Sequence, residues 1–284
     1  MTTLTPPVAR PAQHGDTTGL SFPGVLRSEW IKLRSLRSTI WSYIILVVLA
    51  LGMALLMSLS FVSGGGPAGE MDASALTTEA QADLLVQAST FGAFFGQLVV
   101  AVLGVLVITG EYSTGMIRST LAAVPTRLPA LAAKAVVLSA VTFVMATISA
   151  VGAFFVASAV FADSGIAANL FDSDVILPIL GSALYLALVA LFALGVGTML
   201  RSSAGGIATV VGILLVLPLV LQMIPAEWVQ DVLPYVLSTA GVGLFSDTSA
   251  AAEATPFWEN LLIVLAWVGA SIAGATVLLK RRDA

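Results

Sequence analysis

A polar segment with the sequence GEYSTGMIRSTLAAVPTR, residues 110–127, separates two long apolar runs and carries Glu111, Arg118 and Arg127. A carboxylate and two guanidinium groups in so short a stretch can form ion pairs and charge-assisted hydrogen bonds. Such groups are suited to holding a groove on a partner protein, although each surface ion pair contributes only about 0–1 kcal/mol. The segment therefore indicates a contact site for a partner protein.

Residues that catalysis or metal binding needs are scarce in the rest of the chain. There is no cysteine and a single histidine, His14, which argues against disulfides, zinc sites and histidine-based acid–base catalysis. The nucleotide-binding loop GxxxxGK[ST] and the hydrolase signatures HExxH and GxSxG are missing. Asp172 and Asp174 could form a metal pair, but a solvated loop end fits them better. We expect no metal, no cofactor and no enzymatic activity in this chain.

The composition is typical of an integral membrane protein. The chain of 284 residues is 58% hydrophobic and 10% charged, and its mean hydropathy is +1.01. Soluble domains carry about 25% charged residues, and a run of about 20 apolar residues suffices to cross a bilayer. We predict an all-α membrane protein with six transmembrane helices. They lie near residues 39–62, 88–109, 130–161, 175–200, 205–224 and 260–279.

The charged residues sort themselves by these six crossings. All 12 Lys and Arg residues fall in segments on one side of the membrane, and most of the 16 Asp and Glu residues fall on the other. The positive-inside rule then places both termini in the cytoplasm. Residues 1–21 are predicted to form a disordered cytoplasmic tail, and residues 22–284 the six-span domain. The abundance of Arg, Ala, Gly and Val fits a bacterial protein of the plasma membrane.

The predicted span centres contain no ionisable residue, although such residues usually mark proton pathways in membranes. This disfavours a proton-coupled carrier and leaves open sodium coupling through backbone carbonyls. Gly92 and Gly96 form a GxxxG pattern that lets two helices approach closely. The pattern serves either internal packing, which we favour, or a dimer contact.

The stretch FPGVLRSEWIKLRSLRSTIW, residues 22–41, predicts an amphipathic helix ahead of the first span. Its apolar arc should lie in the lipid boundary, with its cations at anionic headgroups. Glu29 intrudes on that arc, where it can pair with Lys32 three residues on. A plain positively charged anchor is the alternative. The residues expected to characterise this interfacial helix are Leu26, Glu29, Trp30, Leu33 and Arg34.

In the opening segment, Ser113 or Thr114 is expected to cap a short helix that carries Met116 and ends at Pro125. This helix would cross the cytoplasmic mouth of the second and third spans and expose Glu111. An ordinary basic loop is the alternative.

The two stretches SEWIKLRSLRSTIW and GEYSTGMIRSTLAAVPTR, with six spans between and after them, resemble the type-2 permease subunits of ATP-binding-cassette (ABC) exporters over residues 22–284. The resemblance implies that the first stretch is a connecting helix and the second a coupling helix. The coupling helix would dock on a separate ATPase subunit, which binds ATP and Mg²⁺. The implied contact residues are Glu111, Tyr112, Ser113, Thr114, Gly115, Met116, Ile117, Arg118 and Arg127. The implied second, smaller cytoplasmic contact consists of Arg201, Ser202 and Ser203.

The resemblance further implies that this chain is half of an exporter, completed by a second copy or a paralogue. Residues 226–259 would then resemble a re-entrant external segment, although Asp231 and the acids near 247–259 make the segment unusually polar. Two alternatives stay open: a secondary carrier without an ATPase, and a non-transporting membrane anchor or immunity subunit. No nucleic-acid partner is expected.

Overall fold

The structure is a computed structural model, and it describes residues 21–65, 76–116, 128–246 and 256–281. Within these ranges the chain is helical and contains no strand. Six helical segments are long and apolar enough to span a membrane, so the predicted fold class is confirmed. These segments are Arg37–Ser63, Thr78–Ser113, Leu128–Ser164, Ser173–Leu200, Ser203–Gln222 and Phe257–Arg281.

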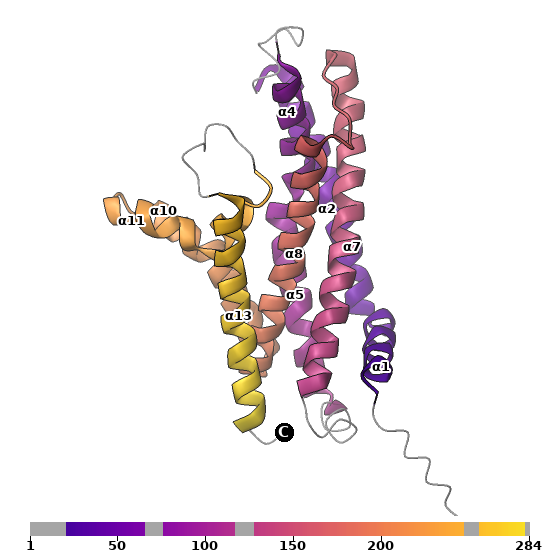
Figure 1. Ribbon diagram of the computed structural model, residues 1–284, viewed down its shortest axis with the longest axis vertical. Coiled ribbons are helices and arrows are strands. Elements are labelled where there is room, and N and C mark those ends of the chain that lie inside the picture. The colour runs from indigo at the N-terminus through magenta and orange to yellow at the C-terminus, as the bar shows by residue number, and fades with distance from the viewer. Residues whose placement is uncertain (1–20, 66–75, 117–127, 247–255, 282–284) are drawn as a thin grey trace, which may run out of the picture.

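A short helix precedes the first span, and the second and fifth spans each contain two α-helices (Figure 1). The helices that build the bundle are α1 (Phe22–Ser35), α2 (Arg37–Ser60), α4 (Thr78–Thr90), α5 (Gly92–Ser113), α7 (Leu128–Phe161), α8 (Ser173–Leu200), α9 (Ser203–Val211), α10 (Leu217–Gln222) and α13 (Phe257–Arg281). Two short helices, α11 (Glu227–Val232) and α12 (Leu237–Val242), lie between α10 and α13.

The second and third spans extend well beyond a bilayer core. Helix α7 has 34 residues, about 50 Å at 1.5 Å per residue, against a hydrocarbon thickness of about 30 Å. Helix α4 continues α5 at the end of the bundle opposite α1 (Figure 1) and packs there against α7 and α8. The buried side chains of Leu85, Phe154 and Phe161 form a second core in this extension.

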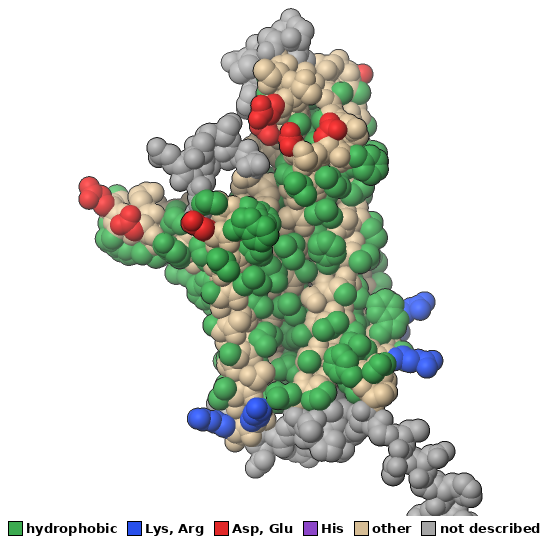
Figure 2. All heavy atoms as spheres, in the orientation of Figure 1, with side chains coloured by type: hydrophobic (Ala, Val, Ile, Leu, Met, Phe, Trp, Pro, Cys, Tyr) green, Lys and Arg blue, Asp and Glu red, His purple; other side chains and the backbone are tan. Residues whose placement is uncertain are grey.

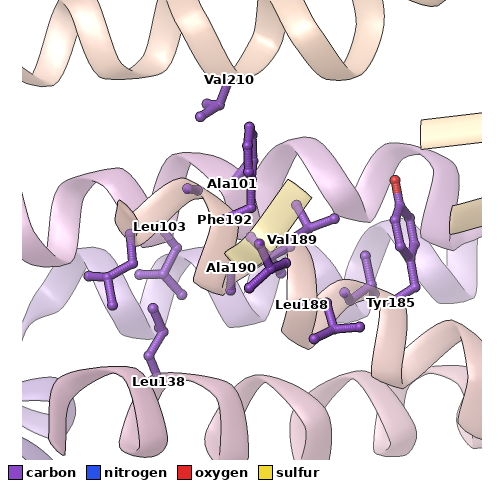
Figure 3. Close-up of a cluster of buried hydrophobic side chains, with 14 of the residues drawn as sticks. Ala101, Leu103, Leu138, Tyr185, Leu188, Val189, Ala190, Phe192 and Val210 are labelled. Carbon is purple, nitrogen blue, oxygen red and sulfur yellow. The ribbon is translucent and has the colours of Figure 1, made fainter. Parts of the chain in front are cut away.

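Helices α5 and α8 form the centre of the bundle. In the most apolar stretch of α8, 72% of the residues are buried, against 22% in the fifth and sixth spans. The main core gathers around α8, as the cluster with Val189, Ala190 and Phe192 shows (Figure 3). Gly104 of α5 lets the two helices touch, because a Cβ atom there would lie 2.5 Å from the Ala190 carbonyl oxygen. The outer helices thus present most of their apolar surface to their surroundings.

Gly92 and Gly96 also lie at a close helix contact, between α5 and α2. A Cβ atom at Gly92 would lie 2.6 Å from the Cα of Ala50, and one at Gly96 would lie 2.7 Å from Cδ1 of Leu46. Both glycines therefore pack within the chain, the alternative that the sequence favoured.

The fifth span bends away from the bundle after a π-helical turn, Gly212–Val216. Pro218 has no N–H to donate four residues back, which accounts for the wider turn. Helices α10 and α11 then project sideways (Figure 1). The chain returns along α13, where the Trp267 indole N–H donates to the Tyr235 carbonyl at 2.9 Å. Trp267 lies ten residues into α13, about 15 Å from its first residue.

In the described part of residues 226–259, the acidic side chains and the buried side chains of α12 lie on different helices. The acids Glu227 and Asp231 are exposed on the projecting α11, whereas Leu237, Ala240 and Gly241 of the returning α12 are buried against α8 and α13. Of the acids near 247–259, Asp247 and Glu253 lie outside the described residues, and Glu259 is exposed in the first turn of α13.

Candidate functional site

The polar segment begins inside a transmembrane helix. Helix α5 continues to Ser113, so Glu111 and Tyr112 belong to its last turn. The hydroxyls of Ser113 and Thr114 donate to the Gly110 carbonyl at 3.0 and 2.8 Å. They therefore satisfy the C-terminal end of α5. The short helix that either residue was predicted to cap lies largely outside the described residues, so the capping stays a prediction. Gly115 adopts a left-handed φ of 72°, which turns the chain, and Met116 is again helical.

The remaining predicted contact residues of this segment, Ile117, Arg118 and Arg127, lie outside the described residues. Ser113 to Met116 are exposed, and Met116 is 45% exposed. These four residues are the described start of the connection between α5 and α7.

The predicted exposure of Glu111 was wrong, because its side chain is buried among three helices. Its Oε1 accepts hydrogen bonds from Lys32 Nζ of α1 at 3.1 Å and from Lys134 Nζ of α7 at 2.8 Å. Lys134 also donates to Glu29 Oε2 at 2.5 Å, and Lys32 donates to Glu29 Oε1 at 2.6 Å. We call Glu29, Lys32, Glu111 and Lys134 the charge cluster.

The charge cluster is electrically balanced, with two carboxylates and two ammonium groups in alternation. Glu29 is 3% exposed and Glu111 and Lys134 are 6% exposed, so these side chains are compensated by one another and not by solvent. Burial by itself would lower the pKa of Lys32, but the hydrogen bond and charge of Glu29 and the charge of Glu111 outweigh it and raise that pKa. Lys32 therefore keeps its proton at neutral pH.

A cavity of about 20 Å³ adjoins the charge cluster, between Leu33, Val107 and Val137. This volume accommodates one water molecule. Glu111 Oε2 has no hydrogen-bond partner among the described residues. A water molecule in the cavity would supply one.

Sequence reasoning predicted the Glu29–Lys32 pair, which the structure confirms, but missed the role of Lys134. A signal was present. Lys134 is an isolated cation near the start of an apolar run, and Glu29 is an isolated anion on an apolar arc. Opposite charges on two apolar faces indicate that the faces meet.

Helix α1 has two apolar faces, where the sequence predicted a single arc toward lipid. Val25, Glu29 and Leu33 are buried toward the bundle, and Val25 packs on Ala130 and Ala133 of α7. Leu26 is partly buried beside them. Away from the bundle Trp30 is 48% and Ile31 56% exposed, and the exposed cation Arg34 follows Trp30 by one helical turn. Only this second face is available to the bilayer surface.

We expect Trp30→Asp to weaken membrane assembly more than Ser28→Asp. Trp30 presents half of its surface outward, so a charge there removes roughly 1–2 kcal/mol of apolar burial in the lipid boundary. Ser28 is exposed on the polar side, where its hydroxyl only donates to the Val25 carbonyl. The amount of folded protein in the membrane fraction measures the difference. Equal losses would favour the plain anchor.

The predicted second contact, the turn from Arg201 to Ser203, lies against the end of α5. Arg201 ends α8 with a left-handed φ of 52°, and its guanidinium lies 5.1 Å from the centre of the Tyr112 ring. The Ser203 hydroxyl donates to Thr109 Oγ1 at 2.8 Å, and Ser202 caps α9 by accepting from Gly205 N. The structure therefore places this turn beside the last turn of α5, where the first predicted contact segment begins. Gly92 and Gly96, at the other end of α5, are not part of it.

The family model described as ABC-2 family transporter protein matches residues 24–284, nearly the whole chain. The chain belongs to the ABC-2 transporter family. No curated protein matches it. As a member of the ABC-2 family, the chain is a multi-pass membrane protein and a permease subunit of an ABC transporter. The resemblance seen in residues 22–41 and 110–127 is thereby confirmed at the level of the family.

Proposed function

We propose that this ABC-2 permease subunit belongs to an exporter of a bacterial plasma membrane and is driven by a separate ATPase that docks where α5 ends. The observation that carries the proposal is the convergence of α1, the end of α5 and the Arg201–Ser203 turn on one surface. Export is the direction that the resemblance to exporter subunits implies. ATP and Mg²⁺ would be bound by the partner, since this chain has no phosphate-binding loop of the P-loop type.

The distribution of charge supports a cytoplasmic position for this surface. Basic side chains gather at the end where α1 and the last turn of α13 lie, and acidic side chains at the opposite end and on the projecting α11 (Figure 2). The positive-inside rule assigns the basic end to the cytoplasm.

The chain has no cysteine, so this orientation can be tested with single introduced cysteines. Asp172→Cys should react with an impermeant maleimide on intact cells. Ser202→Cys and Lys280→Cys should react only after permeabilisation. All three positions are exposed. Labelling of Ser202→Cys from outside would contradict the orientation.

The burial of Glu111 divides the predicted contact residues into two groups. The exposed residues Ser113 to Met116, together with Ile117, Arg118 and Arg127, would face the ATPase. Tyr112 is partly buried beside Arg201, and Glu111 belongs to the charge cluster. These two residues would not contact the ATPase and would instead fix the position of the contact surface.

The transport path is proposed to lie between two permease chains, either two copies or this chain and a paralogue. Two cavities inside the described part of the bundle have volumes of about 20 and 10 Å³, room for water alone. Small-molecule sites occupy about 300–1,000 Å³. The apolar surfaces of the first, fifth and sixth spans, with 22–28% of residues buried, leave ample area for a partner chain and lipid.

The proposed docking is tested by co-purification with the proposed ATPase partner. Asp at both Met116 and Ile117 should reduce recovery of the ATPase about tenfold or more, because charge replaces apolar contact at the start of the docking segment. Phe171→Asp is the matched control, since Phe171 is an 81% exposed apolar residue at the opposite end. Normal recovery with the double variant would make this segment an ordinary loop.

A further inference from the structure

The charge cluster connects three elements that the proposed function treats separately. Glu29 and Lys32 come from α1, Glu111 from the last turn of α5, and Lys134 from the second turn of α7. The exposed start of the proposed docking segment, Ser113, follows Glu111 by two residues. Any displacement of this segment therefore acts within one helical turn of the charge cluster.

Lys134 holds the central position in the charge cluster. It binds both carboxylates, at 2.5 Å from Glu29 and 2.8 Å from Glu111, and its side chain is 7% exposed. Lys32 binds the same two carboxylates, but its side chain is 27% exposed and can reach solvent. The ion pairs made by Lys134 thus constrain α1, α5 and α7 to move together.

We propose that the charge cluster is the joint that makes α1, the cytoplasmic end of α5 and the start of α7 one rigid body, with Lys134 as its positioning residue. The inference rests on the proposed function in one respect, since the ATPase is what would move this body. The apolar contacts between α1 and α7, such as Val25 with Ala130 and Ala133, reinforce the joint. Leu33 of α1 shares the main apolar core with Val107 of α5, and the four charges add the hydrogen-bonded link from α1 to the end of α5.

The balanced charge of the cluster allows the joint to be removed without leaving a lone buried ion. A neutral variant combines Glu29→Gln, Lys32→Met, Glu111→Gln and Lys134→Met. Replacing a complete buried ion pair by uncharged groups is often tolerated, whereas removing one partner is not. The matched control combines Glu227→Gln and Asp231→Asn, which removes two exposed charges on α11.

The test measures distances with pairs of spin labels on cysteines introduced into the cysteine-free chain. One pair joins Ile31 of α1, 56% exposed, to Met116, 45% exposed. A second pair joins Met116 to Lys280 at the end of α13. Both are recorded in nanodiscs with the ATPase bound, without nucleotide and after trapping with ATP and vanadate. Labelled chains are diluted with unlabelled ones so that distances stay within one chain.

In the wild-type background the Ile31–Met116 distance should be narrow and unchanged by nucleotide, while the Met116–Lys280 distance shifts. In the neutral variant the Ile31–Met116 distribution should broaden and shift with nucleotide, and ATPase turnover of the complex should fall about tenfold. The α11 control should behave as the wild type. An Ile31–Met116 distribution in the neutral variant identical to that of the wild type would overturn the joint.

Failure of the proposed function gives a different result. If the wild-type chain binds no ATPase, the proposed docking is wrong. The proposed joint is then tested by the spin-label distances of the permease without ATPase. A narrow Ile31–Met116 distribution in the wild type and a broad one in the neutral variant still support it. Equal widths overturn it.

Discussion

Lys134→Met is expected to lower the free energy of unfolding by about 3–5 kcal/mol, because it leaves the carboxylates of Glu29 and Glu111 buried with only Lys32 to share. The cost comes from charge left without its counter-ion and not from lost packing, since methionine retains most of the apolar stem of lysine. Unfolding in mixed micelles, followed by helical circular dichroism, measures it.

Lys280→Met provides the control for this prediction. It removes the same charge at the end of another span, but from an exposed position. We expect a change within about 0.5 kcal/mol. Similar losses for both variants would show that the buried ion pairs of Lys134 contribute no more to stability than a surface charge does.

Gly104→Ala is expected to destabilise the bundle by about 1–3 kcal/mol through overpacking. The new methyl group would lie 2.5 Å from the Ala190 carbonyl oxygen and 2.9 Å from the Ala193 Cβ, so α5 and α8 must separate. Because these helices form the centre of the core, the neighbouring side chains have little room to adjust.

Gly110→Ala in the same helix isolates the packing effect. A Cβ atom at Gly110 meets no other atom within 4 Å. The substitution should therefore be neutral or stabilising by up to about 1 kcal/mol, through the helix propensity of alanine. If both alanine variants unfold at the same denaturant concentration, the close contact at Gly104 does not support the core.

The six spans could be predicted because the bilayer fixes both their length and the side on which cations remain. Apolar run length and the location of all 12 basic residues led to the same six segments that the structure contains. Helix α4 was missed because Glu79, Gln81 and Asp83 make it polar. Its start was nevertheless marked by Thr77, whose side chain accepts from Ala80 N at 3.2 Å.

The charge cluster could not be predicted in full, because hydropathy gives no information on which helices are neighbours. Lys134 and Glu29 are 105 residues apart in the chain, and Lys32 and Glu111 are 79 apart. Glu111 was predicted to be exposed for the same reason, because the sequence does not show which helices surround it. A carboxylate at the border of an apolar run ends up either in water or with buried cations, and only tertiary packing decides between them.

The most direct test of an ATPase-driven permease is a photo-crosslink from the proposed docking surface. A benzophenone attached to Met116→Cys, in the otherwise cysteine-free chain, is irradiated in membranes that contain the proposed ATPase partner. We expect a covalent adduct between the two chains, and none when the benzophenone is attached to Asp172→Cys at the opposite end. No adduct from Met116→Cys, or equal adducts from both positions, would contradict the account.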